Sequence, residues 1–173
     1  MTESLQNILT TLLRKDKMVA FLKKNPNLFD ETLKVSLGNM EPQSWRAAWL
    51  LKHYMSKNDV RVIPSINKIL KAIPNKKDGH QRELLKILME MELTEKQEGI
   101  LFDKSISIWE DINKSPSVRS FAFLVLINTV KKYPELITEI GFLTQGHYTE
   151  TLSPGIRRSV VRTIKELKIN IWF

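Results

Sequence analysis

The chain has 173 residues, of which 42% are hydrophobic and 27% charged, so we expect one folded domain and no extensive disorder. It contains no cysteine, which excludes disulfides, thiolate catalysis and cysteine-based metal sites. The longest apolar run, residues 121–127, is far shorter than the roughly 20 residues that a membrane span needs. With no early basic cluster typical of a signal peptide, we expect a cytoplasmic protein that does not enter a membrane.

The net charge of +8 is unevenly distributed along the chain. Residues 1–86 hold 16 Lys and Arg against 8 Asp and Glu, whereas residues 87–173 hold 11 of each. Within the second half, residues 90–111 are acidic and the residues from 154 onward are basic. Such a pattern either steers a charged partner or serves solubility alone.

Apolar residues recur at helical spacing throughout, which predicts nine or ten helices and no sheet. In chain order, a helical segment at about 4–24 precedes three helix starts that are each marked by a polar residue and a proline. We interpret the polar residue as the N-cap and the proline as the first helical residue. These starts are Glu41-Pro42, Ser115-Pro116 and Ser153-Pro154.

Several sequence features repeat with a common period. Leu28-Phe29-Asp30 returns 73 residues later as Leu101-Phe102-Asp103, and residues 23–28 resemble residues 131–136 at an offset of 108. An arginine near the start of an apolar helix recurs at spacings of 36, 37 and 39, as Arg46, Arg82, Arg119 and Arg158. A period near 37 filled by two short helices predicts an α-solenoid.

The openings of three helices resemble the second helix of HEAT repeats, an armadillo-like class. They are Glu41 to Ala48, Ser115 to Ala122 and Ser153 to Val160, whereas the fourth, Asp78 to Arg82, has Gly79 in place of proline. The resemblance implies an all-α, right-handed α-α superhelix with four repeats at about 27–57, 59–92, 94–132 and 134–169. A cap would cover about 4–24, and the second helices would line a concave binding side. Residues 121–127, apolar all round, should be covered on most sides.

Basic side chains on these second helices are our candidates for partner binding: Arg46, Lys52, Arg82, Arg119, Arg157, Arg158, Arg162 and Lys165. The four periodic arginines either grip carboxylates and phosphates or serve packing between repeats, and packing is favoured because they repeat at a fold-defining position. Trp45 and Trp49, four residues apart among basic residues, either stack bases or belong to the core, and the core is favoured. Trp109 is predicted to be core.

No pattern predicts a catalytic, cofactor or metal site. The three histidines have no metal-ligand neighbour at helical spacing, and neither a phosphate-binding glycine loop nor a nucleophile elbow occurs. We therefore expect a non-enzymatic scaffold that binds another protein, without a cofactor. An enzyme of unknown type would require a polar pocket with perturbed carboxylates or histidine.

The alternative is a nucleic-acid-binding protein, because Trp45 to Trp49 is similar to segments of HEAT-like DNA alkylation-repair proteins. Arg46, Lys52, Lys76 and Lys77 would then contact phosphates. The apolar tail, residues 169–173, either caps the last repeat or docks on another chain. We expect a monomer or a weak homodimer.

Overall fold

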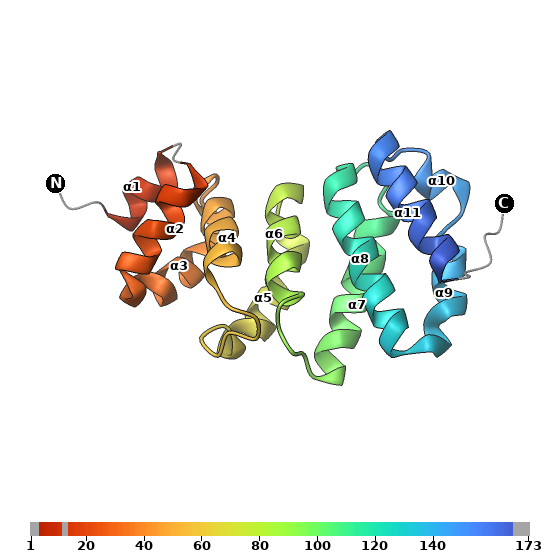
Figure 1. Cartoon of the computed structure of the whole chain (residues 1–173), viewed down its shortest axis with the longest axis horizontal. Coiled ribbons are helices and arrows are strands. Elements are labelled where there is room, and N and C mark those ends of the chain that lie inside the picture. Colours follow the sequence, from red (N-terminus) through yellow and green to blue (C-terminus); the bar gives the residue numbers. More distant parts are fainter. Residues whose placement is uncertain (1–3, 12–13, 168–173) are drawn as a thin grey trace. The chain divides into compact units, whose positions relative to one another are not determined.

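The computed structural model describes residues 4–11 and 14–167, and within these ranges the chain is all-helical (Figure 1). Eleven α-helices and four 3-10 turns make up the described secondary structure. The fold class predicted from sequence, an all-α helical-repeat protein, is confirmed. Lys168 and the apolar tail at 169–173 lie outside the described residues.

The chain divides into two compact units, Met1–Leu93 (unit 1) and Thr94–Phe173 (unit 2). The boundary falls between the second and third predicted repeats. The helices of unit 1 are α1 (Leu5–Thr10), α2 (Lys15–Lys24), α3 (Phe29–Ser36), α4 (Gln43–Tyr54), α5 (Ile66–Ala72) and α6 (Asp78–Leu88). Its 3-10 turns are η1 (Pro26–Leu28), η2 (Ile63–Ser65) and η3 (Ile73–Asn75).

Helix α4 is the centre of unit 1, because α1, α2, α3 and α6 all pack against it. The segment predicted as a cap at about 4–24 contains two helices, α1 and α2. Their buried side chains form one apolar cluster with Ala47 and Leu50 of α4. Trp49 packs against the same cluster, and the Nε1 atom of the half-buried Trp45 is also shielded from solvent.

Unit 2 contains α7 (Glu95–Glu110), α8 (Pro116–Lys132), η4 (Pro134–Leu136), α9 (Ile137–Phe142), α10 (Gly146–Thr149) and α11 (Pro154–Glu166). One apolar cluster extends from Phe102 of α7 to Ile164 of α11. Trp109 lies in this cluster with no exposed surface, as predicted, and its Nε1 donates to the Leu143 carbonyl oxygen at 2.7 Å.

Two of the three predicted helix starts are confirmed. Pro116 and Pro154 are the first residues of α8 and α11. The prediction for Glu41 as an N-cap is wrong, because α4 begins at Gln43 with Pro42 in the N-cap position. The Glu41 carboxylate instead contacts His80 on α6.

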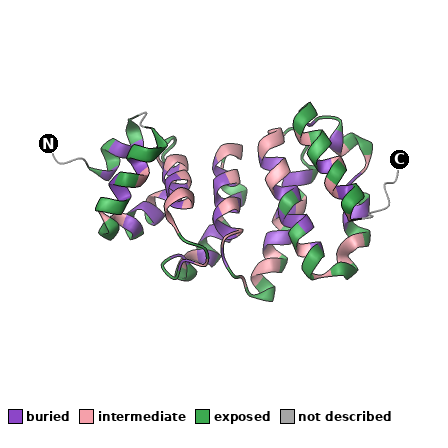
Figure 2. Cartoon of the chain, in the orientation of Figure 1, coloured by how far each residue is buried: buried purple, intermediate pink, exposed green. Residues whose placement is uncertain are grey.

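The apolar run in α8 is covered on most sides, as expected. Five of its seven residues, 122, 123, 125, 126 and 127, are buried. Phe121 is half-buried, and Leu124 is exposed over 40% of its surface. Figure 2 shows the alternation of buried and exposed positions along the helices. An exposed leucine on a buried helix is one starting point for locating a binding surface.

Candidate partner-binding surface

Arg46 holds the end of helix α1. Its Nη1 atom donates to the carbonyl oxygens of Leu9, Thr10 and Thr11 at 3.0, 2.9 and 3.2 Å. The last carbonyls of a helix lack partners within the helix, and a cation placed there is favoured by the helix dipole. Arg46 therefore joins α4 to the first helix of the chain.

Arg119 is buried without exposed surface. Its guanidinium donates to the carbonyl oxygens of Trp109 at 2.9 Å and Tyr148 at 2.6 Å, and to the Thr151 hydroxyl at 2.6 Å. Burial lowers the pKa of Arg119. This side chain connects the end of α7 to α10 and does not reach the surface, so we leave it out of the partner surface.

Two further candidates in unit 1 form ion pairs within the unit. Arg82 pairs with Glu83, whose carboxylate is fully buried, at 2.9 Å, and Lys86 lies 3.2 Å from the same carboxylate. Lys52 pairs with Glu90 at 2.8 Å. Each of these cations therefore already has an anionic neighbour.

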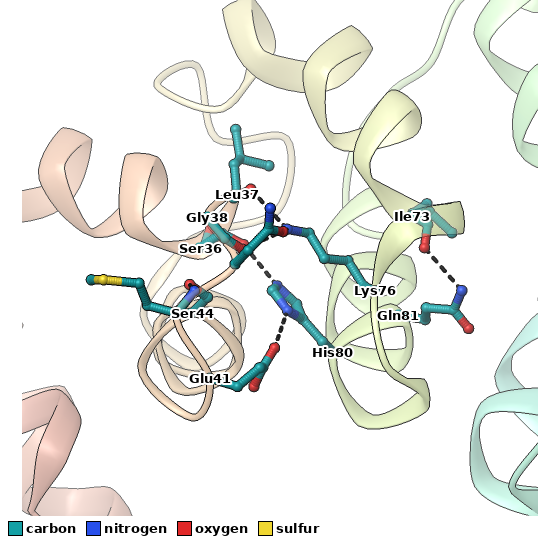
Figure 3. Close-up of polar contacts among 11 residues, drawn as sticks. Ser36, Leu37, Gly38, Glu41, Ser44, Ile73, Lys76, His80 and Gln81 are labelled. Carbon is teal, nitrogen blue, oxygen red and sulfur yellow. Dashed lines mark hydrogen bonds and ion pairs between the residues drawn. The ribbon is translucent and has the colours of Figure 1, made fainter.

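Helix α6 also grips the turn between α3 and α4, as Figure 3 shows. The His80 side chain is fully buried, with Nε2 2.7 Å from the Ser36 carbonyl oxygen and Nδ1 2.8 Å from Glu41 Oε1. A carbonyl oxygen only accepts, so Nε2 carries a proton and donates to Ser36. The other ring nitrogen, Nδ1, faces the Glu41 carboxyl group.

Lys76 adds a second tie to the same turn. Its ammonium group donates to the carbonyl oxygens of Leu37 and Gly38 and to Oδ1 of Asn39. Burial lowers the pKa of Lys76. Lys76, just before α6, and His80 on α6 thus join the α3–α4 turn to α6. The sequence had predicted no structural role for either residue.

The four basic candidates on α11 have a different environment. Arg157, Arg158, Arg162 and Lys165 are all exposed. Their only ion pair within the described residues joins Arg162 Nε to Glu166 at 3.8 Å, and both side chains are largely exposed. Arg158, Arg162 and Lys165 follow one another at intervals of four and three residues, which places them on one helix face.

A shallow groove of about 190 Å³ lies between α8 and α11 in unit 2. The α8 wall includes Ser120, Phe121 and Leu124, and the α11 wall includes Ile156, Ser159 and Thr163. Arg158 and Arg162 directly precede Ser159 and Thr163 in the chain, so they lie about 100° around α11 from these two groove residues. We refer to the groove and this basic face together as the α8–α11 surface.

The basic residues of this surface were predicted from the sequence to bind a partner, whereas the groove residues were not. A signal for the α8 wall was present, because Ser117, Ser120, Leu124 and Asn128 recur at intervals of three and four residues. That spacing places one leucine within a polar stripe. The α11 wall had no comparable signal.

Within residues 4–11 and 14–167, no group of three or more histidine, aspartate or glutamate side chains is arranged to hold a metal ion. None of the helices in that part of the chain is long and apolar enough to cross a membrane.

The packing of paired helices in both units defines a helical-repeat protein of the solenoid class. A family model described as HEAT repeat domain matches residues 3–167. The chain therefore belongs to the HEAT repeat family, which confirms the resemblance carried by the second-helix openings. No curated protein and no solved structure matches the chain. The similarity to DNA alkylation-repair proteins stays a prediction.

Proposed function

We propose that this HEAT repeat protein is a non-enzymatic interaction module that binds an acidic segment of another protein on the α8–α11 surface. One observation carries the proposal. The arginine at the repeated position is engaged with the backbone at Arg46 and Arg119, whereas Arg158 is exposed on α11, the helix that forms one wall of the groove.

The chemistry of the α8–α11 surface favours a segment with carboxylates and one apolar anchor. Guanidinium groups bind carboxylates in bidentate geometry, and exposed arginines retain their donors for a partner. Leu124, Phe121 and Ile156 supply apolar contact within the groove. Pockets for small molecules usually have volumes of about 300–1,000 Å³, so a groove of about 190 Å³ fits a side chain of a protein better than a cofactor.

The test measures binding of a fluorescent acidic amphipathic peptide, with leucine at helical spacing, to the full chain by anisotropy. We expect the double variant Arg158→Glu/Arg162→Glu to weaken binding by about tenfold or more, because attraction to the acidic peptide becomes repulsion along α11. Leu124→Ser should weaken it by a smaller factor, because only the apolar contact is lost.

The matched control is Lys68→Glu/Lys71→Glu, which changes the net charge equally at two exposed positions of α5 in unit 1. It should leave the affinity unchanged. An equal loss in the control would show that net charge alone attracts the peptide. Absence of binding at about 50 mM salt, where screening is weak, would also contradict the proposal.

A further inference from the structure

Unit 1 contains a second hollow, far larger than the groove of unit 2. It is an open cleft of about 700 Å³ between α2 and the end of α4. Arg14, Lys15 and Lys23 contribute cations to its walls, and Asp16 is the one carboxylate among the lining residues. Val19 and Ala20 of α2 and His53 of α4 supply the uncharged part.

The cations occupy two ends of the cleft. Arg14 and Lys15 lie at the start of α2 and Lys23 lies eight residues after Lys15, which corresponds to about 12 Å along a helix. The side chains of Lys15 and Lys23 are exposed and form no ion pair or hydrogen bond with the described residues. Arg14 contacts Asp16 at 3.5 Å, but both side chains are highly exposed, so this pair contributes little.

The ring of His53 is held in place between these ends. Its Nδ1 atom is 2.8 Å from the Trp49 carbonyl oxygen, and because that oxygen only accepts, Nδ1 donates. The His53 and Trp49 rings lie 4.3 Å apart at an angle of 39°. The hydrogen bond and the ring contact together fix an aromatic ring at the wall of the cleft.

We propose that the α2–α4 cleft binds single-stranded nucleic acid. Backbone phosphates contact Arg14 and Lys15 at one end and Lys23 at the other, and a base packs against His53 and the apolar Val19 and Ala20. Proteins that bind single-stranded nucleic acid combine a cationic groove with aromatic side chains on which bases stack. A lone nucleotide carries its phosphates at one end and would reach one cationic end of the cleft, whereas a strand reaches both.

This site differs from the one expected from sequence. Arg46 and Lys76 donate to carbonyl oxygens, and Lys52 pairs with Glu90. Of the four residues predicted to contact phosphates, these three therefore already have partners in unit 1. The exposed cations of α2 take over that role. Lys17 and Lys24, which are also exposed on α2, add to the local positive potential.

The test measures anisotropy of a short fluorescent single-stranded DNA of mixed sequence with the full chain. Contacts to three phosphates predict that the affinity falls about 20-fold between about 50 and 200 mM salt, because counterions are released from the strand. Lys15→Glu/Lys23→Glu should weaken binding by about tenfold or more. Lys68→Glu/Lys71→Glu, with the same charge change, should leave it unchanged.

A second pair of variants tests the aromatic contact. His53→Ala should weaken binding by about fivefold or more through loss of stacking, whereas His53→Phe should retain most of it. With an abasic strand of the same length, His53→Ala and the unaltered chain should bind equally, because no base reaches the ring. If His53→Ala weakened binding of the abasic strand as much as binding of the normal strand, the stacking role of His53 would be overturned.

Three further results would overturn the proposal. They are no binding at about 50 mM salt, equal affinity for duplex DNA, and equally effective competition by polyglutamate of matched charge, which would identify an acidic protein segment as the occupant. Arg158→Glu/Arg162→Glu should not affect this site. The experiments therefore distinguish a failure of the proposal for the α2–α4 cleft from a failure of the proposal for the α8–α11 surface.

Discussion

The two units hold their helices together by different means. In unit 1, polar ties supplement the apolar cluster of α1, α2 and α4: Lys76 and His80 grip the α3–α4 turn, and buried Asp59 pairs with Arg61. The described core of unit 2 is one apolar cluster from α7 to α11, with Arg119 as its buried cation. Helices α3 and α5 have 8 and 7 residues, whereas α7 and α8 have 16 and 17.

Helix length explains this contrast. A short helix buries little apolar surface, yet it leaves as many unpaired backbone groups at its ends as a long one does. The ends of α1 and α3 meet cations from later segments of unit 1, Arg46 of α4 and Lys76 just before α6. Long helices such as α7 and α8 bury an extended face and depend less on such ties. The ties made by Arg46 and Lys76 therefore lie at the ends of short helices.

The largest expected effect concerns Arg119, the buried cation of unit 2. Arg119→Ala removes three hydrogen bonds and leaves the buried carbonyl oxygens of Trp109 and Tyr148 without their donor. We expect a loss of about 3 kcal/mol or more in the free energy of unfolding, measured by urea denaturation with circular dichroism. The result would show that unit 2 also depends on a buried cation.

Arg158→Ala is the matched control, at the same position of the next repeat. Because Arg158 is exposed, we expect a change within about 0.5 kcal/mol. Similar losses in the two variants would contradict the distinction between a structural and a free arginine.

Asp59→Asn tests the polar ties of unit 1. Asp59 is 4% exposed and accepts hydrogen bonds from Arg61 Nε at 2.9 Å and Nη2 at 2.6 Å. These side-chain bonds lower the pKa of Asp59 from 3.8 to about 2. The Arg61 guanidinium also lies 3.7 Å from the centroid of the Phe29 ring. We expect the variant to lose about 2 kcal/mol at neutral pH.

The pH dependence has a defined sign. The folded-state pKa of Asp59 lies below the unfolded value, so its stabilisation is complete above about pH 5 and is lost as the pH falls through about 2. The difference in unfolding free energy between the unaltered chain and Asp59→Asn should therefore shrink over that range. Hydrogen exchange should place the loss in unit 1, and a difference that is constant from pH 7 to 2 would refute this explanation.

The smallest expected effects come from two glycines, one in each unit. A Cβ atom at Gly99, exposed within α7, would meet nothing within 4 Å, so Gly99→Ala should stabilise unit 2 by about 0.5–1 kcal/mol through helix propensity. A Cβ atom at Gly38, in the turn gripped by Lys76, would lie 3.1 Å from Ser44 Oγ and the Val35 carbonyl oxygen. Gly38→Ala should destabilise unit 1, and thermal unfolding of both variants checks the opposite signs.

Patterns in the sequence were sufficient to predict the fold class. Apolar spacing and the proline starts predicted helices because they depend on residues close together in the chain, and the period near 37 predicted the repeat family because it can be counted along the sequence. The start of α4 was mispredicted because the Glu41 carboxylate has a partner 39 residues away, on α6. No pattern among neighbouring residues predicts a contact between side chains so far apart in the chain.

The sequence by itself determined that this protein is an all-α member of the HEAT repeat family with an arginine repeated at the start of its second helices. Only the tertiary structure decided what each arginine does. Arg46 faces the end of α1, Arg119 faces Trp109 and Tyr148, and Arg158 is exposed to solvent. The physical reason is that the role of a guanidinium depends on which hydrogen-bond acceptors lie next to it. Packing brings those acceptors from distant parts of the chain.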